Sequence, residues 1–149
     1  MPRRKLTEIL QKFHSFGVFL LTIGEAGNYN MVMEMKKKAI TEKLICACPA
    51  LKEDIDAHCK EFPEIYLHLL FGDILNPYLL DLLNNAKRNK VQLTKIAQLL
   101  ELMSGSDEML QEVVMTTVLE RLSDEPVKIE RFKEFAGQIT LNFIKELQR

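Results

Sequence analysis

The 149 residues include 20 lysines and arginines and 21 aspartates and glutamates, which gives a net charge of -1 at pH 7. Such a balance provides no general attraction to phosphate backbones and disfavours a dedicated nucleic-acid-binding protein. The length fits one domain with a sizeable core, and the sequence, 47% hydrophobic, contains no apolar run long enough to cross a bilayer.

Residues 1–30 differ in character from the rest and are interpreted as an N-terminal extension before a single helical domain of residues 31–149. A basic start and an apolar run at residues 16–23 resemble a secretory signal, but the polar residues between them and the lack of a small-x-small cleavage site make a poor match. An amphipathic helix is a second interpretation. A third is that translation begins at Met31 or Met33.

From Met33 onward the sequence predicts helices with short connections and no convincing strand. A first helix over residues 33–46 has its lysines on the wet side and ends before Pro49, and a second covers residues 51–59. Gly72-Asp73 and Asn76-Pro77 are consecutive breakers, which predict that residues 64–71 and 77–87 form separate helices joined by a turn.

The next helix, over residues 91–103, is predicted to place Glu101 in water. Gly105 is expected to supply a left-handed end, and Ser106 or Asp107 to cap the helix that follows. That helix, residues 109–122, is apolar around most of its circumference and leaves only a narrow polar stripe. It must therefore be packed on more than one side. Two shorter helices follow, around residues 129–136 and 139–147.

The predicted fold class is all-α. A helix, a four-residue break and an inner helix resemble a HEAT or armadillo unit, in which stacked hairpins place every second helix inside. Only residues 91–122 fit this repeat clearly, so a compact helical bundle stays open as the alternative.

Two segments, residues 70–79 and 111–122, resemble an uncharacterised family of small bacterial all-helical domains of unknown function. The resemblance covers approximately residues 33–149. Such proteins are similar to HEAT-like immunity proteins, which neutralise toxins by binding them. The resemblance therefore implies a binding function, and its motifs are structural rather than catalytic.

Motifs of enzymes are missing from the sequence: it has no Gly-x-Gly-x-x-Gly, Walker, His-Glu-x-x-His or Gly-x-Ser-x-Gly pattern. None of His14, His58 and His68 has a nucleophile in a recognisable frame, and His68 is expected to be a hydrogen-bonded core or boundary residue. We therefore expect no enzymatic activity and no cofactor.

Cys46, Cys48, His58 and Cys59 form a local cluster that could hold a metal in a metal-dependent enzyme, which is the alternative function. Cys46 and Cys48 diverge by about 200° on a helix, and no Cys-x-x-Cys knuckle is present. We expect small apolar core residues rather than ligands. An odd number of cysteines in a chain of this size indicates a reducing compartment, and we expect the cytoplasm.

The lysine run at residues 36–38, with Lys43, would be the footprint of a small DNA-binding regulator, but no aromatic or further basic residues interleave with it. The preferred function is binding of a protein partner, with a toxin-neutralising immunity role or another regulatory role as its specific form. An inner helix lines the concave surface of a solenoid, so its polar stripe is where a partner would bind. The predicted partner-binding residues are Asp73, Asn76, Glu112, Thr116 and Glu120.

Overall fold

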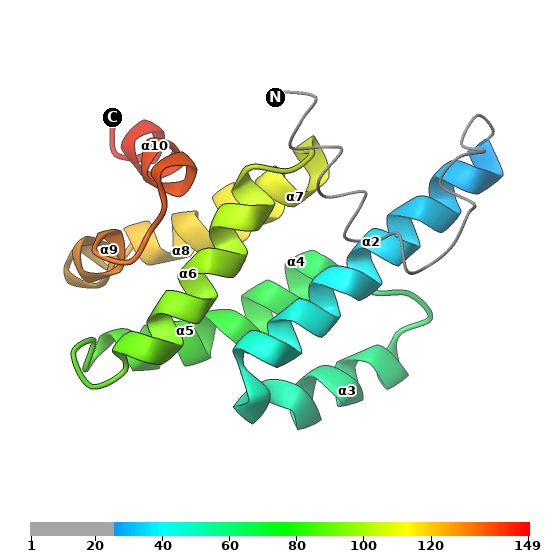
Figure 1. Ribbon diagram of the computed structural model, residues 1–149, viewed down its shortest axis with the longest axis horizontal. Helices are drawn as coiled ribbons and strands as arrows, with labels where there is room; N and C mark the ends of the chain where they lie inside the picture. Colours follow the sequence, from blue (N-terminus) through cyan, green and yellow to red (C-terminus); the bar gives the residue numbers. More distant parts are fainter. Residues whose placement is uncertain (1–25) are drawn as a thin grey trace.

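The first helix, α2 (Ala26–Ala47), starts the part of the chain that the computed structural model describes, residues 26–149 (Figure 1). It begins seven residues before the predicted start at Met33, so the expected boundary after residue 30 lies inside a helix. The interpretations of residues 1–25 as a signal or an amphipathic helix lie outside the described residues. A translation start at Met31 or Met33 stays a prediction.

Helix α2 ends before Pro49, as predicted, and Pro49 begins a short 3-10 turn, η3 (Pro49–Leu51). Helix α3 (Lys52–Glu61) follows directly and carries Glu53 and Asp54 in its first turn, where acids interact favourably with the helix dipole. The predicted second helix is thus confirmed to within two residues.

The turn predicted between residues 71 and 77 is wrong. The chain instead forms one continuous helix over residues 67–83, made of α4 (Leu67–Leu69), a π-helical segment η4 (Leu70–Leu75) and α5 (Asn76–Leu83). Within a regular helix, the ring of Pro77 would clash with the carbonyl group four residues earlier. The π turn widens the helix just before this proline, with Asn76 N–H donating to the Phe71 carbonyl oxygen, five residues back.

Helix α6 (Lys90–Ser104) ends at Gly105, which has a φ of -85° and is therefore not in the expected left-handed conformation. The capping prediction is confirmed at Asp107, whose Oδ1 accepts from Leu110 N–H at 3.1 Å. From this cap a second long helix runs over residues 108–123, through α7 (Glu108–Glu112), the π-helical η5 (Val113–Leu119) and α8 (Glu120–Ser123).

Helices α9 (Pro126–Lys133) and α10 (Gln138–Leu147) complete the chain. Glu101 of α6 was predicted to face water, but the structure places its carboxylate against the start of α10. Its carboxylate accepts from the backbone N–H groups of Ile139 and Thr140, at 3.1 and 2.9 Å, and from the Thr140 hydroxyl at 2.9 Å. A side chain from another helix thus supplies the N-terminal cap of α10. A Cβ atom on Gly137 would overlap this carboxylate, which explains the glycine.

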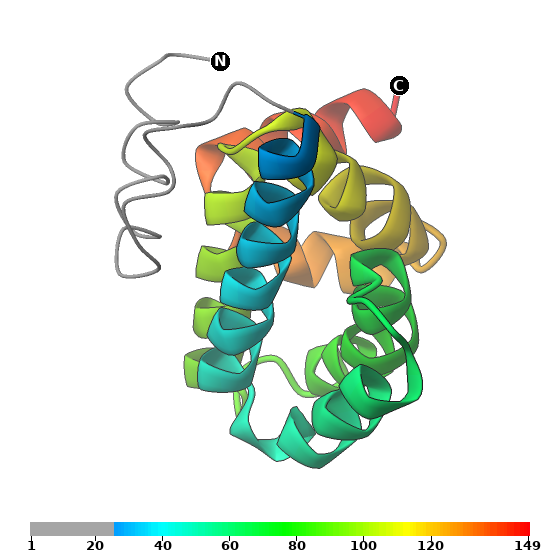
Figure 2. The ribbon, with the colours of Figure 1, turned by 90° about the vertical axis from the view of Figure 1, so that its right-hand side faces the viewer.

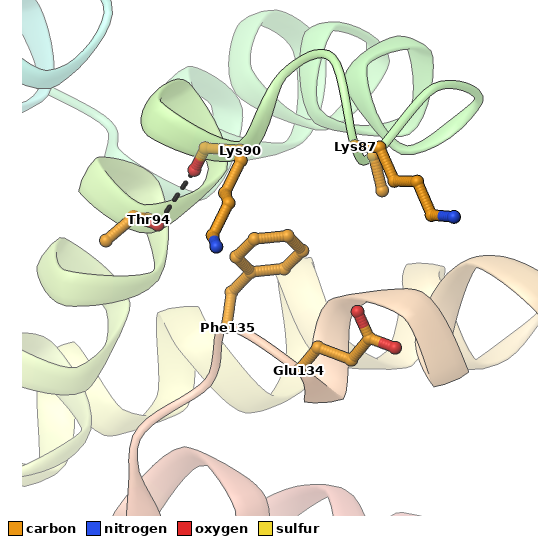
Figure 3. A pocket seen from close by; sticks show the side chains of 6 residues that line it. Lys87, Lys90, Thr94, Glu134 and Phe135 are labelled. Atoms are coloured by element: carbon orange, nitrogen blue, oxygen red, sulfur yellow. Dashed lines mark hydrogen bonds between the residues drawn. The ribbon is translucent and has the colours of Figure 1, made fainter.

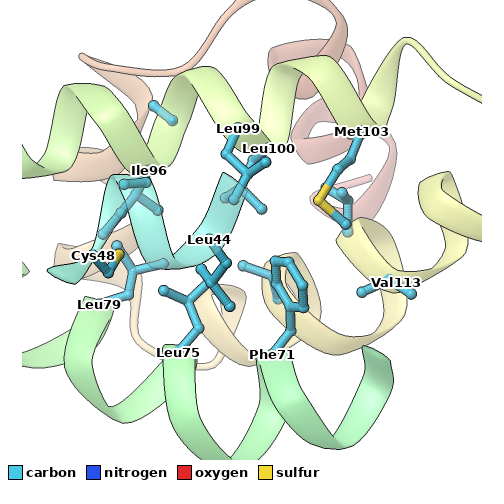
Figure 4. Close-up of a cluster of buried hydrophobic side chains, with 14 of the residues drawn as sticks. Leu44, Cys48, Phe71, Leu75, Leu79, Ile96, Leu99, Leu100, Met103 and Val113 are labelled. Atoms are coloured by element: carbon cyan, nitrogen blue, oxygen red, sulfur yellow. The ribbon is translucent and has the colours of Figure 1, made fainter. Parts of the chain in front are cut away.

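The core lies between α2 and α6, which run side by side, and the helix of residues 67–83, which faces them (Figure 2). Leu44, Phe71, Leu75 and Leu100 are fully buried there (Figure 4). The described residues contain helices and no strand, which confirms the all-α prediction as a compact helical fold. No helix within residues 26–149 combines the length and apolar character that a membrane crossing requires.

Candidate functional site

The two π-helical segments, η4 and η5, contact each other along a seam that is centred on Thr117. The Thr117 hydroxyl lies 2.6 Å from His68 Nδ1, and the Thr117 carbonyl oxygen accepts a hydrogen bond from Asn76 Nδ2 at 2.9 Å. π segments occur often at functional sites. This seam joins the helix that carries Asp73 to the helix that carries the polar stripe.

Gly72 allows the close approach of the two helices at the seam. A Cβ atom at this position would lie 3.2 Å from the Thr117 methyl group, which is tighter than ordinary van der Waals contact. The glycine that the sequence assigned to a turn therefore lies inside a helix and serves its packing.

Asn76 was predicted to contact a partner at the surface, but the structure buries it and leaves only 6% of it exposed. Its amide nitrogen binds the Thr117 carbonyl, and its Oδ1 is buried without a hydrogen-bond partner among the described residues. The structure thus gives Asn76 a role in joining two helices. Its expected contact with a partner would require the seam to open.

The polar stripe of Glu112, Thr116 and Glu120 is exposed, whereas the apolar residues of the same helix are buried or half-buried. The Thr116 hydroxyl donates to the Glu112 carbonyl oxygen at 2.8 Å. Within residues 26–149 neither carboxylate of the stripe forms an ion pair. Asp73 is exposed on the neighbouring helix, so acids from both helices reach the surface.

His68 and Thr117 are seam residues that the sequence analysis missed as a pair. His68 is exposed and hydrogen-bonded, which agrees with a boundary residue and not with a core one. The two residues are 49 positions apart, and no local spacing connects them. The apolar periodicity of each helix indicated that both pack inward but not which faces meet.

The cysteines were expected to be small apolar core residues, and the structure agrees for Cys48, which is fully buried, but not for Cys46, which is exposed. All three cysteines are free thiols. Across the described part of the chain, no three His, Cys, Asp or Glu side chains are grouped so that they could hold a metal ion. Burial raises the pKa of the Cys48 thiol to about 11, although a contact from Gln92 partly opposes this shift.

Alkylation of the native protein with iodoacetamide at pH 8 should therefore modify Cys46 fully and Cys48 hardly at all. The thiolate is the reactive form, and at three pH units below its pKa only about one Cys48 thiol in a thousand is ionised. Peptide mass spectrometry of the alkylated protein measures this, with urea-unfolded protein as the control in which all three cysteines react. Rapid native labelling of Cys48 would contradict the burial described here.

The lysine run does not form the fully solvated face that was expected. Lys36 is only 11% exposed and pairs with Asp107 at 2.7 Å, which connects α2 to the cap of α7. Lys37 pairs with Glu34 at 3.1 Å. Two of the three lysines thus have acidic partners, which weakens the case for a DNA-binding surface.

A groove of about 650 Å³ lies between α3 and residues 73–78. We call it the His58 groove. His58 is 8% exposed, and its Nε2 is buried without a hydrogen-bond partner in the described structure. Leaving a buried polar atom unsatisfied costs about 1–3 kcal/mol. The groove is lined by Leu51, Asp54, Ala57, His58, Glu61, Phe62, Asp73, Ile74, Pro77 and Tyr78.

A second pocket, of about 420 Å³, lies where the α5–α6 connection approaches the end of α9. Figure 3 shows Lys87, Lys90 and Glu134 around the ring of Phe135. The Thr94 hydroxyl in this pocket is used within its own helix, because it donates to the Lys90 carbonyl oxygen at 2.7 Å. Its lysines share the pocket with an acid, and no buried polar atom there lacks a partner.

Comparison with family models finds a match over residues 41–149 to DUF7674, described as a domain of unknown function. This range includes both segments that carried the resemblance, as well as the seam and the His58 groove. No curated protein and no solved structure matches the chain.

Proposed function

We propose that this chain, which belongs to the DUF7674 family of domains of unknown function, is a non-enzymatic module that binds another protein through its acidic stripe. The supporting observation is the contrast within the helix of residues 108–123. Its apolar positions are covered by other helices, while Glu112 and Glu120 reach solvent without ion-pairing partners in the described structure.

The charge of this surface indicates the chemistry of the partner. Three exposed carboxylates, those of Asp73, Glu112 and Glu120, come from two helices that are joined at the seam. Complementary charge steers the encounter of two proteins and determines their register. The partner would present a basic surface to the stripe.

The specific form that we propose is toxin neutralisation by an immunity protein in the bacterial cytoplasm. This form rests on the resemblance to HEAT-like immunity proteins, and the free thiols of the cysteines are consistent with a reducing compartment. A gene for a large secreted toxin beside the gene for this protein would favour immunity. A metabolic neighbourhood would favour another regulatory role.

Reversing the stripe, Glu112→Lys with Glu120→Lys, should reduce capture of the native partner at least tenfold. Like charges brought together at an interface cost several kcal/mol, whereas exposed substitutions change stability by only about 0.5 kcal/mol. The measurement is quantitative mass spectrometry of proteins that the immobilised variant and wild type retain from extracts of the native cell.

The matched control is Glu134→Lys with Glu146→Lys, which makes the same change in net charge at exposed positions on α10 and beside α9. It should retain the partner as wild type does, and all three proteins should melt alike. Equal retention by the stripe variant and wild type would remove the stripe as the binding surface.

A further inference from the structure

The His58 groove presents hydrogen-bond acceptors and no cation. Asp54, His58 and Glu61 lie on one face of α3, and Asp73 lies on the opposite wall. With its proton on Nδ1, a neutral histidine has an acceptor at Nε2, and an ionised carboxylate only accepts. The open hydrogen-bonding capacity of the groove therefore favours a ligand that donates.

Aromatic rings form part of the groove. The rings of His58 and Phe62 have centroids 4.7 Å apart, and Phe62 meets Tyr66 edge to face at 5.4 Å. Tyr78 lines the opposite wall and is half-buried. A cation close to an aromatic face is attracted by the ring quadrupole, and guanidinium groups stack there most often.

No positively charged side chain of the described residues already fills this position. None of Asp54, Glu61 and Asp73 forms an ion pair with a lysine or arginine in residues 26–149. The lining itself contains no lysine or arginine. An anionic ligand would meet three like charges at the rim.

We propose that the His58 groove binds an arginine or lysine side chain that a protein partner presents. This inference rests on the proposed function, since it takes the ligand from a protein, and it adds a second contact to that of the stripe. The carboxylates would hold the charged head, and Phe62 and Tyr78 would cover the aliphatic stem. The His58 ring would turn toward the ligand so that Nε2, which is buried in the free protein, accepts one N–H.

The probe is the blocked tripeptide acetyl-Gly-Arg-Gly-amide, and the matched control is the same peptide with citrulline, which keeps the shape but has no charge. Titration of isotope-labelled protein, followed by NMR, should show saturable shifts for His58, Ala57 and Asp73 with the arginine peptide. The lysine analogue should bind to the same residues. The citrulline peptide should bind at least fivefold more weakly.

Two variants test the assigned residues. Asp54→Asn with Glu61→Gln changes only exposed positions and should weaken binding of the arginine peptide at least fivefold. His58→Phe keeps a ring beside Phe62 but removes the acceptor, and should weaken binding with the fold intact by circular dichroism. If His58→Phe does not fold, the carboxylate variant alone decides the result.

The stripe variant separates this inference from the proposed function. Glu112→Lys with Glu120→Lys should bind the arginine peptide as wild type does, even where it fails to capture the partner. If the stripe variant binds the arginine peptide and also still captures the partner, the stripe is not the binding surface. The assignment of the groove is then unaffected. Equal binding of arginine and citrulline peptides, shifts outside the groove, or no saturable shifts would each overturn the groove.

Discussion

Val118→Asp should lower the free energy of unfolding by about 4 kcal/mol or more, which is a large part of the total stability of a small domain. Val118 is fully buried in η5. An aspartate there either keeps its charge among apolar side chains or binds a proton at the expense of folding, and it leaves the space of the valine poorly filled. Urea unfolding followed by circular dichroism at 222 nm measures the loss.

Thr116→Asp is the control for this prediction, because it adds the same side chain to the same π segment at an exposed position. It should change the free energy of unfolding by about 0.5 kcal/mol. Similar losses for the two variants would mean that the helix is not packed as described.

Glu101→Ala should cost about 2–3 kcal/mol, which is more than an ordinary exposed substitution costs. The change leaves three donors at the start of α10 without their acceptor: the N–H groups of Ile139 and Thr140 and the Thr140 hydroxyl. Hydrogen bonds to a charged group are stronger than neutral ones, and a helix cap alone contributes about 1 kcal/mol. Thermal and urea unfolding both report this effect.

Gln98→Ala provides the matched control on the exposed side of the same helix, α6. It should be close to neutral, because the change removes no hydrogen bond described for residues 26–149. Gly137→Ala should be destabilising for the same reason as Glu101→Ala, since the added methyl group displaces the capping carboxylate. A stable Glu101→Ala protein would show that water replaces the cap without loss.

A helix could be predicted from the sequence where the spacing of its own apolar residues indicates it. The helix over residues 109–122 is apolar on most sides, and the structure buries those sides while it exposes Glu112, Thr116 and Glu120. The helix over residues 67–83 was divided because glycine and proline usually end helices. In the structure the helix continues through both residues: a π turn precedes Pro77, and Gly72 packs against Thr117, which lies far away in the chain.

In the candidate site too, features within one helix could be predicted, whereas features that depend on two distant segments could not. The exposed acids of the stripe were predicted, because they occupy one sector of a single helix. The His58 groove was not, since its second wall comes from residues 73–78 and only folding places it opposite α3. Spacing on α3 indicates that Asp54, His58 and Glu61 share a face. It contains no information on what that face meets.

The contacts of Thr117 also affect how quickly and at what entropic cost a partner could be bound. To slide by one turn, either long helix would have to break the Asn76 bond and leave the notch at Gly72. The spacing between Asp73 and the acids of the stripe, Glu112 at the end of α7 and Glu120 at the start of α8, is thus already set before any partner arrives. Binding to a prearranged surface loses little conformational entropy, so the geometry favours rapid association without rearrangement of the helices.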